Sequence, residues 1–308
     1  MGFVRRKPHK QFVKIRDKMR FRDLIQEAAY LLVEAGVEGG RLEAELLAEH
    51  CFGLSRTELF LNAEKDISLP DYDRFNVLLK RRLRREPLHY ITGVREFWSL
   101  DFTITPDTLI PRPETEFLLD HVLAILRESN FVPSDILDMC TGSGVIAIVL
   151  ARELGVPVLG VDISLPALKT AAGNISKHGV RDSVTLCCSD LFSSLGDEAR
   201  FDCIVANPPY VSLHAKCSLE PEVKDWEPAK ALFAGPDGLD VINRICADSP
   251  RFLRSGGWVF LEIGADQQQR VEALFSGYVV GTKRVYQHVA VIPDLSGRPR
   301  VLQAQFIG

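Results

Sequence analysis

The sequence predicts an α/β protein in which a mainly parallel sheet follows an N-terminal bundle of helices. Helical periodicity dominates residues 21–95, short apolar strands alternate with amphipathic helices from residue 135 onward, and a glycine-rich turn joins the first of these strands to the next helix. Strands that alternate with helices form parallel sheets covered on both faces. The chain has 308 residues, of which 46% are hydrophobic and 25% charged, so it is long enough for two globular domains.

The N-terminal helices are predicted from the spacing of apolar residues and from residues that begin and end helices. Apolar side chains in residues 21–32 recur on one face of a 3.6-residue period, and a second helix is expected over residues 42–51. Ser55 and Glu58 have the spacing of a capping box, which predicts a short third helix. A fourth helix is expected over residues 71–85, where a proline ends it. Together these helices are expected to form a small all-helical domain.

The rest of the chain is predicted to be extended over residues 96–105 and then to alternate between helix and strand. The expected strands cover residues 136–139, 156–161, 184–188, 201–206, 257–263, 279–285 and 300–306. The expected helices cover residues 114–127, 145–153, 165–178, 239–253 and 267–274. The last two strands flank a loop with Pro293, Gly297 and Pro299, and we expect them to pair as an antiparallel hairpin at the sheet edge.

These elements divide the chain into four segments. We expect a basic, disordered tail at residues 1–20, a helical domain at 21–95, an extended or hairpin linker at 96–111 and the sheet domain at 112–308. The tail carries eight Lys or Arg against one acidic residue, Asp17. A functional basic arm and a transit peptide are the alternatives. The tail has no serine and no apolar core, so it lacks the signature of a transit peptide or a secretory signal.

Charge and cysteine usage exclude several classes of protein. The net charge is −4, and without the basic tail the chain carries −11, which disfavours a protein that binds nucleic acid through phosphates. The KRRLRR segment at residues 80–85 is expected to be a solvated helix end, with an acidic partner or RNA as the alternative contact. The seven cysteines have no CxxC spacing, so we expect buried thiols in a reducing compartment and no metal site.

The first motif that carries chemistry is a glycine-rich turn, Asp138–Ala147, between the first strand of the sheet and its helix. Gly142 and Gly144 let a ligand approach the backbone, and the turn fits the fingerprint G-x-G-x-x-A that several nucleoside-binding enzymes share. Asp162 ends the next strand, 18 residues after Gly144. A carboxylate there accepts hydrogen bonds from ribose hydroxyls, and a helix cap is its alternative role. Asp190 follows the third strand, where an adenine ring would lie, although a turn residue is the alternative.

The motif that decides the interpretation is Asn207-Pro208-Pro209-Tyr210, directly after the strand over residues 201–206. The carboxyl ends of strands form the ligand crevice of open α/β sheets. The two prolines stiffen the turn and lack N–H donors, so the Asn207 side chain and the Pro208 carbonyl present two acceptors in fixed directions. Together with the aromatic surface of Tyr210, they suit a planar NH2 group beside a carbonyl or a ring.

In this order, the motifs resemble class I S-adenosylmethionine-dependent methyltransferases acting on a planar amino nitrogen. More closely, the chain resembles the HemK/PrmC family, the glutamine methyltransferases of peptide chain release factors, over residues 21–308. Further matching segments are Arg41–Leu47, Pro87–Gly93, Leu109–Glu116, Glu227–Pro228, Gly235–Leu239, Gly256–Gly257, Glu262–Gly264 and Asp294–Arg300. Two residues depart from the family pattern, since Cys140 and Ser99 stand where glycine is usual.

The resemblance implies a class I methyltransferase fold and methyl transfer from S-adenosylmethionine, with S-adenosylhomocysteine as the product. The acceptor would be the glutamine amide nitrogen in the Gly-Gly-Gln motif of class I release factors. The implied catalytic residues are Asn207, Pro208, Pro209 and Tyr210. The implied cofactor-binding residues are Cys140, Thr141, Gly142, Ser143, Gly144, Asp162, Asp190, Leu191 and Asn207. Arg112 and Pro113 are further candidates near the mouth of the site.

The implied mechanism depends on geometry and not on a strong base. Asn207 and the Pro208 carbonyl would accept the two amide hydrogens, and Tyr210 would pack against the amide plane. The helical domain would hold the release factor, a protein substrate. We expect a monomer that acts without a metal, a membrane or direct nucleic-acid contact. A bacterial cytoplasm is the expected location, with the mitochondrial matrix as the alternative.

Three other functions remain open at this point. An adenine-N6 methyltransferase on DNA or RNA would also use the Asn207–Tyr210 motif after base flipping. The acidic body of the protein opposes it, as do the 98 residues after Tyr210, which the rest of the sheet uses. A nicotinamide-dependent oxidoreductase would explain the glycine-rich turn but gives Asn207–Tyr210 no role. A non-catalytic module that binds a release factor or the ribosome would need no acceptor at Asn207.

Overall fold

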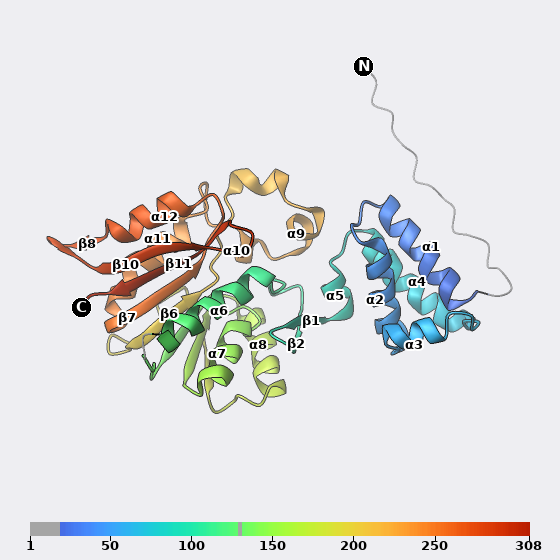
Figure 1. Ribbon diagram of the computed structural model, residues 1–308, viewed down its shortest axis with the longest axis horizontal. Helices are drawn as coiled ribbons and strands as arrows, with labels where there is room; N and C mark the ends of the chain where they lie inside the picture. Colours follow the sequence, from blue (N-terminus) through green and yellow to red (C-terminus); the bar gives the residue numbers. More distant parts are fainter. Residues whose placement is uncertain (1–18, 129–130) are drawn as a thin grey trace, which may run out of the picture. The chain divides into compact units, whose positions relative to one another are not determined.

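Figure 1 shows the computed structural model of the protein, which describes residues 19–128 and 131–308. The chain divides into two compact units, residues 1–92 and 93–308. Apart from Met19 and Arg20, the basic tail predicted at residues 1–20 lies outside the described residues.

The N-terminal unit is helical, as predicted. Its helices in the described residues are α1 (Phe21–Glu34), α2 (Gly40–Phe52), α3 (Arg56–Leu61), α4 (Leu69–Leu83) and α5 (Leu88–Thr92). The apolar face predicted for α1 is buried against Leu47 of α2 and Phe75 of α4, which are both 0% exposed. The predicted capping box of α3 is also confirmed, because Ser55 accepts from the backbone N–H of Glu58 and donates its own N–H to the Glu58 side chain.

The KRRLRR segment is only in part the solvated helix end that we expected, because Lys80 and Arg84 are exposed whereas Arg82 is buried. Arg82 is only 4% exposed and pairs with Glu43 of α2, while Arg81 donates to Glu86 at 2.5 and 2.9 Å. Arg85 donates to the carbonyl oxygen of Gly36 at 2.8 Å. Arg82 and Arg85 therefore connect the end of α4 to the start of α2 and the end of α1, so their charges serve the packing of the helical unit.

The second unit begins with the hairpin of β1 (Val94–Phe97) and β2 (Leu100–Thr103), which overlaps the segment predicted to be extended but starts two residues before it. Phe97 pairs with Leu100, so the loop consists of Trp98 and Ser99 alone, and both have φ of +55°. Two-residue loops with positive φ at both positions are type I′ turns, which favour glycine at the second position. Ser99 therefore occupies a position where its Cβ is unfavourable.

Replacing Ser99 with glycine is expected to stabilise the second unit. A non-glycine residue in the left-handed region costs about 1–2 kcal/mol, and glycine removes this cost. The greater freedom of glycine in the unfolded chain lowers the free energy of unfolding by about 0.4–1 kcal/mol, so a smaller net stabilisation remains. We expect the melting temperature to rise by about 1–3 °C in a thermal unfolding scan. The control is Ser296→Gly in an exposed turn outside the left-handed region, which should lower it. An unchanged or lower value for Ser99→Gly would contradict this account of the turn.

The large sheet contains seven strands in the order β10-β11-β7-β6-β3-β4-β5. Its strands are β3 (Ile136–Met139), β4 (Val158–Asp162), β5 (Val184–Cys188), β6 (Phe201–Ala206), β7 (Leu253–Glu262), β10 (Tyr286–Pro293) and β11 (Pro299–Phe306). Neighbours from β7 to β5 are parallel, whereas β11 is antiparallel to β7 and β10 is antiparallel to β11. The predicted, mainly parallel sheet is thus confirmed, and an antiparallel hairpin lies at its edge as expected, although only β11 of this hairpin is a strand that the sequence predicted.

Helices cover both faces of this sheet (Figure 1). The main ones are α6 (Pro113–Glu128), α7 (Val145–Leu154), α8 (Leu165–Lys177), α11 (Asp240–Asp248) and α12 (Gln268–Ser276). In Figure 1, α6, α7 and α8 lie on one side of the sheet, and α11 and α12 lie on the other. The side of α11 and α12 is closed by one apolar cluster that joins Ile245 and Phe275 to strand residues such as Leu261. In the described residues, no helix combines the length and apolar character needed to cross a membrane.

Most predicted boundaries shift by one or two residues, and the largest differences are at the edge strand, the end of α11 and the start of β7. The edge strand lies at β10, not at residues 279–285, where β8 (Val279–Val280) and β9 (Lys283–Arg284) form a small ladder of their own. A bulge after Gln287 interrupts the alternation in β10 that would have marked it. Helix α11 ends at Asp248, and a short 3-10 turn with Pro250 leads into β7 at Leu253.

The prediction also missed the short helices between β6 and α11. These are η1 (Leu213–Ser218), α9 (Pro221–Trp226) and α10 (Ala229–Leu232). Helices of four to six residues are too short for apolar residues to repeat on one face, so periodicity does not reveal them.

Candidate active site

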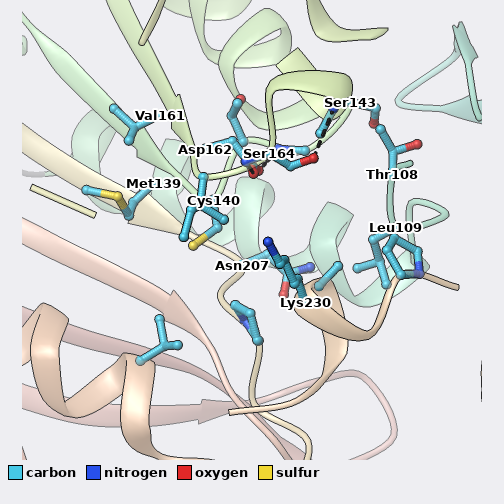
Figure 2. Close-up of a pocket in the computed structure, with 18 of the residues that line it drawn as sticks. Thr108, Leu109, Met139, Cys140, Ser143, Val161, Asp162, Ser164, Asn207 and Lys230 are labelled. Carbon is cyan, nitrogen blue, oxygen red and sulfur yellow. Dashed lines mark hydrogen bonds between the residues drawn. The ribbon is translucent and has the colours of Figure 1, made fainter. Parts of the chain in front are cut away.

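A cavity of about 520 Å³ opens at the carboxyl ends of the parallel strands (Figure 2). The chain runs from β3 to β4 and β5 on one side and then returns to β6 on the other side of β3. The strand order therefore reverses between β3 and β6, which is where open α/β sheets bind ligands. The volume lies within the ~300–1,000 Å³ of small-molecule sites, and it is large enough for a nucleoside.

A buried carboxylate supports the glycine-rich loop that follows β3. Oδ2 of Asp138 accepts hydrogen bonds from Oγ1 of Thr141 at 2.5 Å and from the backbone N–H of Ala147 at 3.0 Å. Burial raises the pKa of Asp138 to about 7, although these two hydrogen bonds oppose the shift. Asp138 thereby connects the loop to the first turn of α7 on the buried side of the loop. The other side of the loop lines the cavity.

The loop backbone provides the close approach that a ligand needs. Gly142 lines the cavity with φ of +56°, and a Cβ there would meet only the carbonyl oxygen of Cys140, at 3.9 Å. The space beside Gly142 therefore belongs to the cavity. A Cβ on Gly144, whose φ is +84°, would lie 3.2 Å from Cβ of Ala171 in α8. Cys140 has φ of +64°, which is the physical reason why a glycine suits its position.

Asp162 lies at the end of β4 and lines the cavity. Its Oδ2 accepts from the backbone N–H of Gly142 at 2.9 Å, and its Oδ1 accepts from that of Ser164 at 2.8 Å. Burial raises the pKa of Asp162, although these hydrogen bonds lower it in part. The N-cap of α8 is Ser164, whose side chain accepts from the N–H of Ala167, so the alternative role of Asp162 as a helix cap is wrong.

Asp190 and Leu191 follow β5 and form another part of the cavity wall. The Asp190 side chain is half exposed, and its Oδ1 accepts from Nη1 of Arg244 in α11 at 2.9 Å. Leu191 is 6% exposed and has a φ of +50°, so the backbone turns sharply at this part of the cavity wall. This region offers an apolar surface beside a carboxylate, which suits a heteroaromatic ring with an amino group.

The Asn207–Tyr210 motif leaves β6 beside the glycine-rich loop. Nδ2 of Asn207 donates to Oγ1 of Thr115 at 2.9 Å, and the Tyr210 hydroxyl donates to Oε1 of Glu262 at 3.0 Å. In the described part of the chain, no donor is hydrogen-bonded to Oδ1 of Asn207 or to the carbonyl oxygen of Pro208. Two acceptors of the motif are therefore without a protein donor, and one of them belongs to Asn207, which lines the cavity.

The opposite wall of the cavity comes from two loops that an ion pair joins. Leu109 and Pro111 contribute from the loop before α6, and Pro228–Ala231 contributes from α10 and the residue before it. Arg112 donates to the buried carboxylate of Glu227, which connects these loops. Burial raises the pKa of Glu227, and the charge of Arg112 opposes the shift.

Two family models match this chain. The model described as the PrmC N-terminal domain matches residues 23–93, and the one described as the methyltransferase small domain matches residues 113–222. The chain is 42% identical over 246 residues to the release factor glutamine methyltransferase of Geobacter sulfurreducens, covering 80% of this chain and 84% of that one. It is 36% identical over 283 residues to the protein of the same name from Nitratidesulfovibrio vulgaris, covering 92% and 94%. The chain belongs to the release factor glutamine methyltransferase family.

Solved structures agree on the fold. The hMettl16 catalytic domain in complex with the MAT2A 3′UTR hairpin 6 has a TM-score of 0.54 at 17% sequence identity, covering 71% of this chain and 80% of that chain. The same domain in complex with hairpin 1 gives 0.54 at 16%, covering 78% and 81%. The predicted class I methyltransferase fold with an N-terminal helical bundle is therefore confirmed, as is the predicted HemK/PrmC family.

Most of the residues predicted for this family's site come together at the cavity. Those that line it are Cys140, Thr141, Gly142, Ser143, Asp162, Asp190, Leu191, Asn207 and Pro209. Gly144, Pro208 and Tyr210 lie behind its lining, and Tyr210 turns its hydroxyl to Glu262. Arg112 and Pro113 are also outside the lining, and the Arg112 guanidinium is paired with Glu227.

Several polar residues at the site had no predicted role. Thr115 lines the cavity and bonds to Asn207, and Glu262 bonds to both Thr115 and Tyr210. Lys230 of α10 contributes a cation to the opposite wall (Figure 2). Thr115 and Glu262 lie in two of the segments that match the family pattern, and this match was the only sign in the sequence that they belong to the site. Their contact is long-range, so no local spacing indicates it.

Proposed function

We propose that this chain transfers a methyl group from S-adenosylmethionine to the glutamine amide nitrogen in the Gly-Gly-Gln motif of class I release factors. One observation carries the proposal. Oδ1 of Asn207 and the Pro208 carbonyl follow the same strand end, without a protein donor in the described residues. A primary amide has two hydrogens on one planar nitrogen, so two neighbouring acceptors match it. The names of the two bacterial relatives support the same substrate.

The cavity suits the nucleoside part of S-adenosylmethionine. We infer that Asp162 accepts hydrogen bonds from the ribose hydroxyls, and that Thr141, Gly142, Ser143 and Gly144 form the backbone cradle. The space beside Gly142 supports this assignment, because any side chain there would enter the cavity. Asp190, Leu191 and Cys140 would contact the adenine. When bound, the cofactor supplies an electrophilic methyl group on a cationic sulfur.

The protein's part in the reaction is to orient a poor nucleophile. The lone pair of an amide nitrogen is delocalised into its carbonyl group, as in the peptide bond. Oδ1 of Asn207 and the Pro208 carbonyl hold both N–H groups, fix the direction of the nitrogen and stabilise the positive charge that develops on it. Such alignment contributes up to about 7–11 kcal/mol in favourable cases. Tyr210 would pack against the amide plane, and the walls of the cavity would exclude water from the two acceptors.

Mass spectrometry of a class I release factor from the same organism tests this function. The factor is incubated with S-adenosylmethionine and the wild-type chain, and a factor with Glu in place of the Gly-Gly-Gln glutamine is the matched control. We expect one added methyl group on the glutamine and none on the control. A release factor left unmodified by a chain that binds S-adenosylhomocysteine would overturn the proposal. An adenine-containing oligonucleotide in a parallel reaction would then test the adenine-N6 alternative.

The roles of the two domains, the oligomeric state and the location of the enzyme are part of the same proposal. We infer that residues 21–95 hold the release factor and that residues 112–308 bind the cofactor, with residues 96–111 between them. The match of residues 23–93 to the PrmC N-terminal domain supports this division of labour. The enzyme would act as a monomer, without a metal or nucleic acid in the complex. Its bacterial relatives support a bacterial cytoplasm, and the mitochondrial matrix stays the alternative.

A further inference from the structure

Both polar side chains of the Asn207–Tyr210 motif depend on one buried carboxylate, that of Glu262 at the end of β7. The Tyr210 hydroxyl donates to Oε1 of Glu262 at 3.0 Å. Thr115, in the first turn of α6, donates from Oγ1 to Oε2 of Glu262 at 2.7 Å and accepts from Nδ2 of Asn207 at 2.9 Å. Thr115 and Glu262 are 2% and 0% exposed, so water does not compete for these hydrogen bonds.

The hydroxyl of Thr115 determines which end of the Asn207 amide faces it. A hydroxyl has one proton to donate, and an ionised carboxylate only accepts. Because the Thr115 proton goes to Glu262, the Thr115 oxygen has only lone pairs left for Asn207. The NH2 end of Asn207 must therefore face Thr115. If the amide were reversed, two acceptors would face each other in a buried place, and each unmade hydrogen bond would carry a desolvation penalty.

We propose that Thr115 and Glu262 are positioning residues that keep the Asn207 amide with Oδ1, and not Nδ2, toward the substrate. This inference rests on the proposed glutamine methylation, in which Asn207 must accept an N–H from the substrate amide. A reversed Asn207 would present a donor to a donor. Glu262 thus acts on the substrate through Asn207 and also holds the ring of Tyr210 through its hydroxyl.

The charge of Glu262 is essential to this arrangement. Burial raises the pKa of Glu262, whereas hydrogen bonds from Thr115 and Tyr210 and the charge of Arg300 on β11 lower it, and the Glu114 carboxylate on α6 raises it further. A neutral Glu262 would donate to Thr115, whose own proton would then turn to Asn207 and reverse the amide. We expect kcat to be retained above the pKa of Glu262 and to be lost as the pH falls through it.

Replacing Thr115 with valine tests the proposal, because valine keeps the shape of threonine and removes the hydroxyl. Methylation of the release factor is measured at saturating S-adenosylmethionine, with Thr115→Ser as the matched control. We expect kcat to fall by about 10–10²-fold in Thr115→Val, with KM for both substrates within about threefold, and to stay within about threefold of wild type in Thr115→Ser. A general packing defect would impair both variants, and a wild-type kcat in Thr115→Val would overturn the proposal.

A second measurement needs neither activity nor a folded valine variant. Hydrogen exchange of the Asn207 side-chain NH2 is followed by NMR in the wild-type chain, with Asn207→Asp to assign the signal and the exposed Asn243 as reference. We expect exchange at Asn207 to be at least tenfold slower than at Asn243. Exchange as fast as at Asn243 would overturn the positioning of Asn207. Slow exchange in a chain that does not methylate the release factor would retain that positioning and overturn the proposed function alone.

Discussion

Replacing Asn207 with alanine is expected to lower kcat for glutamine methylation by about 10²–10³-fold, the effect seen when one preorganised hydrogen bond to a developing charge is removed. The variant retains the Pro208 carbonyl but loses the acceptor that orients the second N–H of the substrate amide. A single remaining acceptor lets the amide rotate about that hydrogen bond. The nitrogen then spends little time in line with the methyl group.

The measurement for Asn207→Ala is single-turnover methylation of the release factor, with S-adenosylhomocysteine affinity determined by calorimetry. Asn207 is one of many residues that line the cavity, so we expect the affinity to stay within about tenfold of wild type. Asn207→Asp is the matched control for shape. Its carboxylate still accepts but has no N–H for Thr115, so kcat should also fall. A kcat within threefold of wild type in Asn207→Ala would contradict the assigned role.

Replacing Asp162 with alanine is expected to lower the affinity for S-adenosylhomocysteine by about 10²-fold. Hydrogen bonds to a charged group contribute about 1.5–3 kcal/mol each, and 1.4 kcal/mol corresponds to a factor of ten. The variant loses the acceptors for the ribose, and it also leaves the N–H groups of Gly142 and Ser164 without their carboxylate partner. The glycine-rich loop would therefore be less well ordered before the ligand binds.

Calorimetric titration with S-adenosylhomocysteine measures the effect of Asp162→Ala, and Asp190→Ala is the control. Asp190 is half exposed and already paired with Arg244, so its replacement should lower the affinity by less than about tenfold. The ligand should also raise the melting temperature of Asp190→Ala more than that of Asp162→Ala. Equal affinities of wild type and Asp162→Ala would exclude the ribose contact.

These variants separate three tasks at one site. Asp162 binds the nucleoside, Asn207 orients the glutamine amide, and Thr115 orients Asn207. The expected results differ accordingly, because Asp162→Ala changes a dissociation constant, whereas Asn207→Ala and Thr115→Val change kcat. A pattern in which all three lower kcat and affinity alike would indicate a common loss of local structure.

Elements and site residues whose signals are contiguous in the chain could be predicted from the amino-acid sequence alone. Strands β3, β5 and β6 have the predicted bounds, since each is a short apolar run between residues that end strands. The glycine-rich turn and Asn207 each follow a strand directly, and Asp162 is the last residue of one. Because parallel strands end at the same edge of a sheet, their common location follows from chain order alone.

The pairing of the polar groups could not be predicted in this way, because it depends on the packing of elements that are distant in the chain. Thr115 and Asn207 are 92 residues apart, and Tyr210 and Glu262 are 52 residues apart, so no helical or strand period relates them. The same holds for Arg82. Its basic segment is typical of a solvated helix end, yet Arg82 pairs with Glu43, 39 residues earlier in the chain. Local patterns report the backbone conformation and which face is apolar. The partner of a buried charge depends on which elements meet, and this is a property of the packed fold.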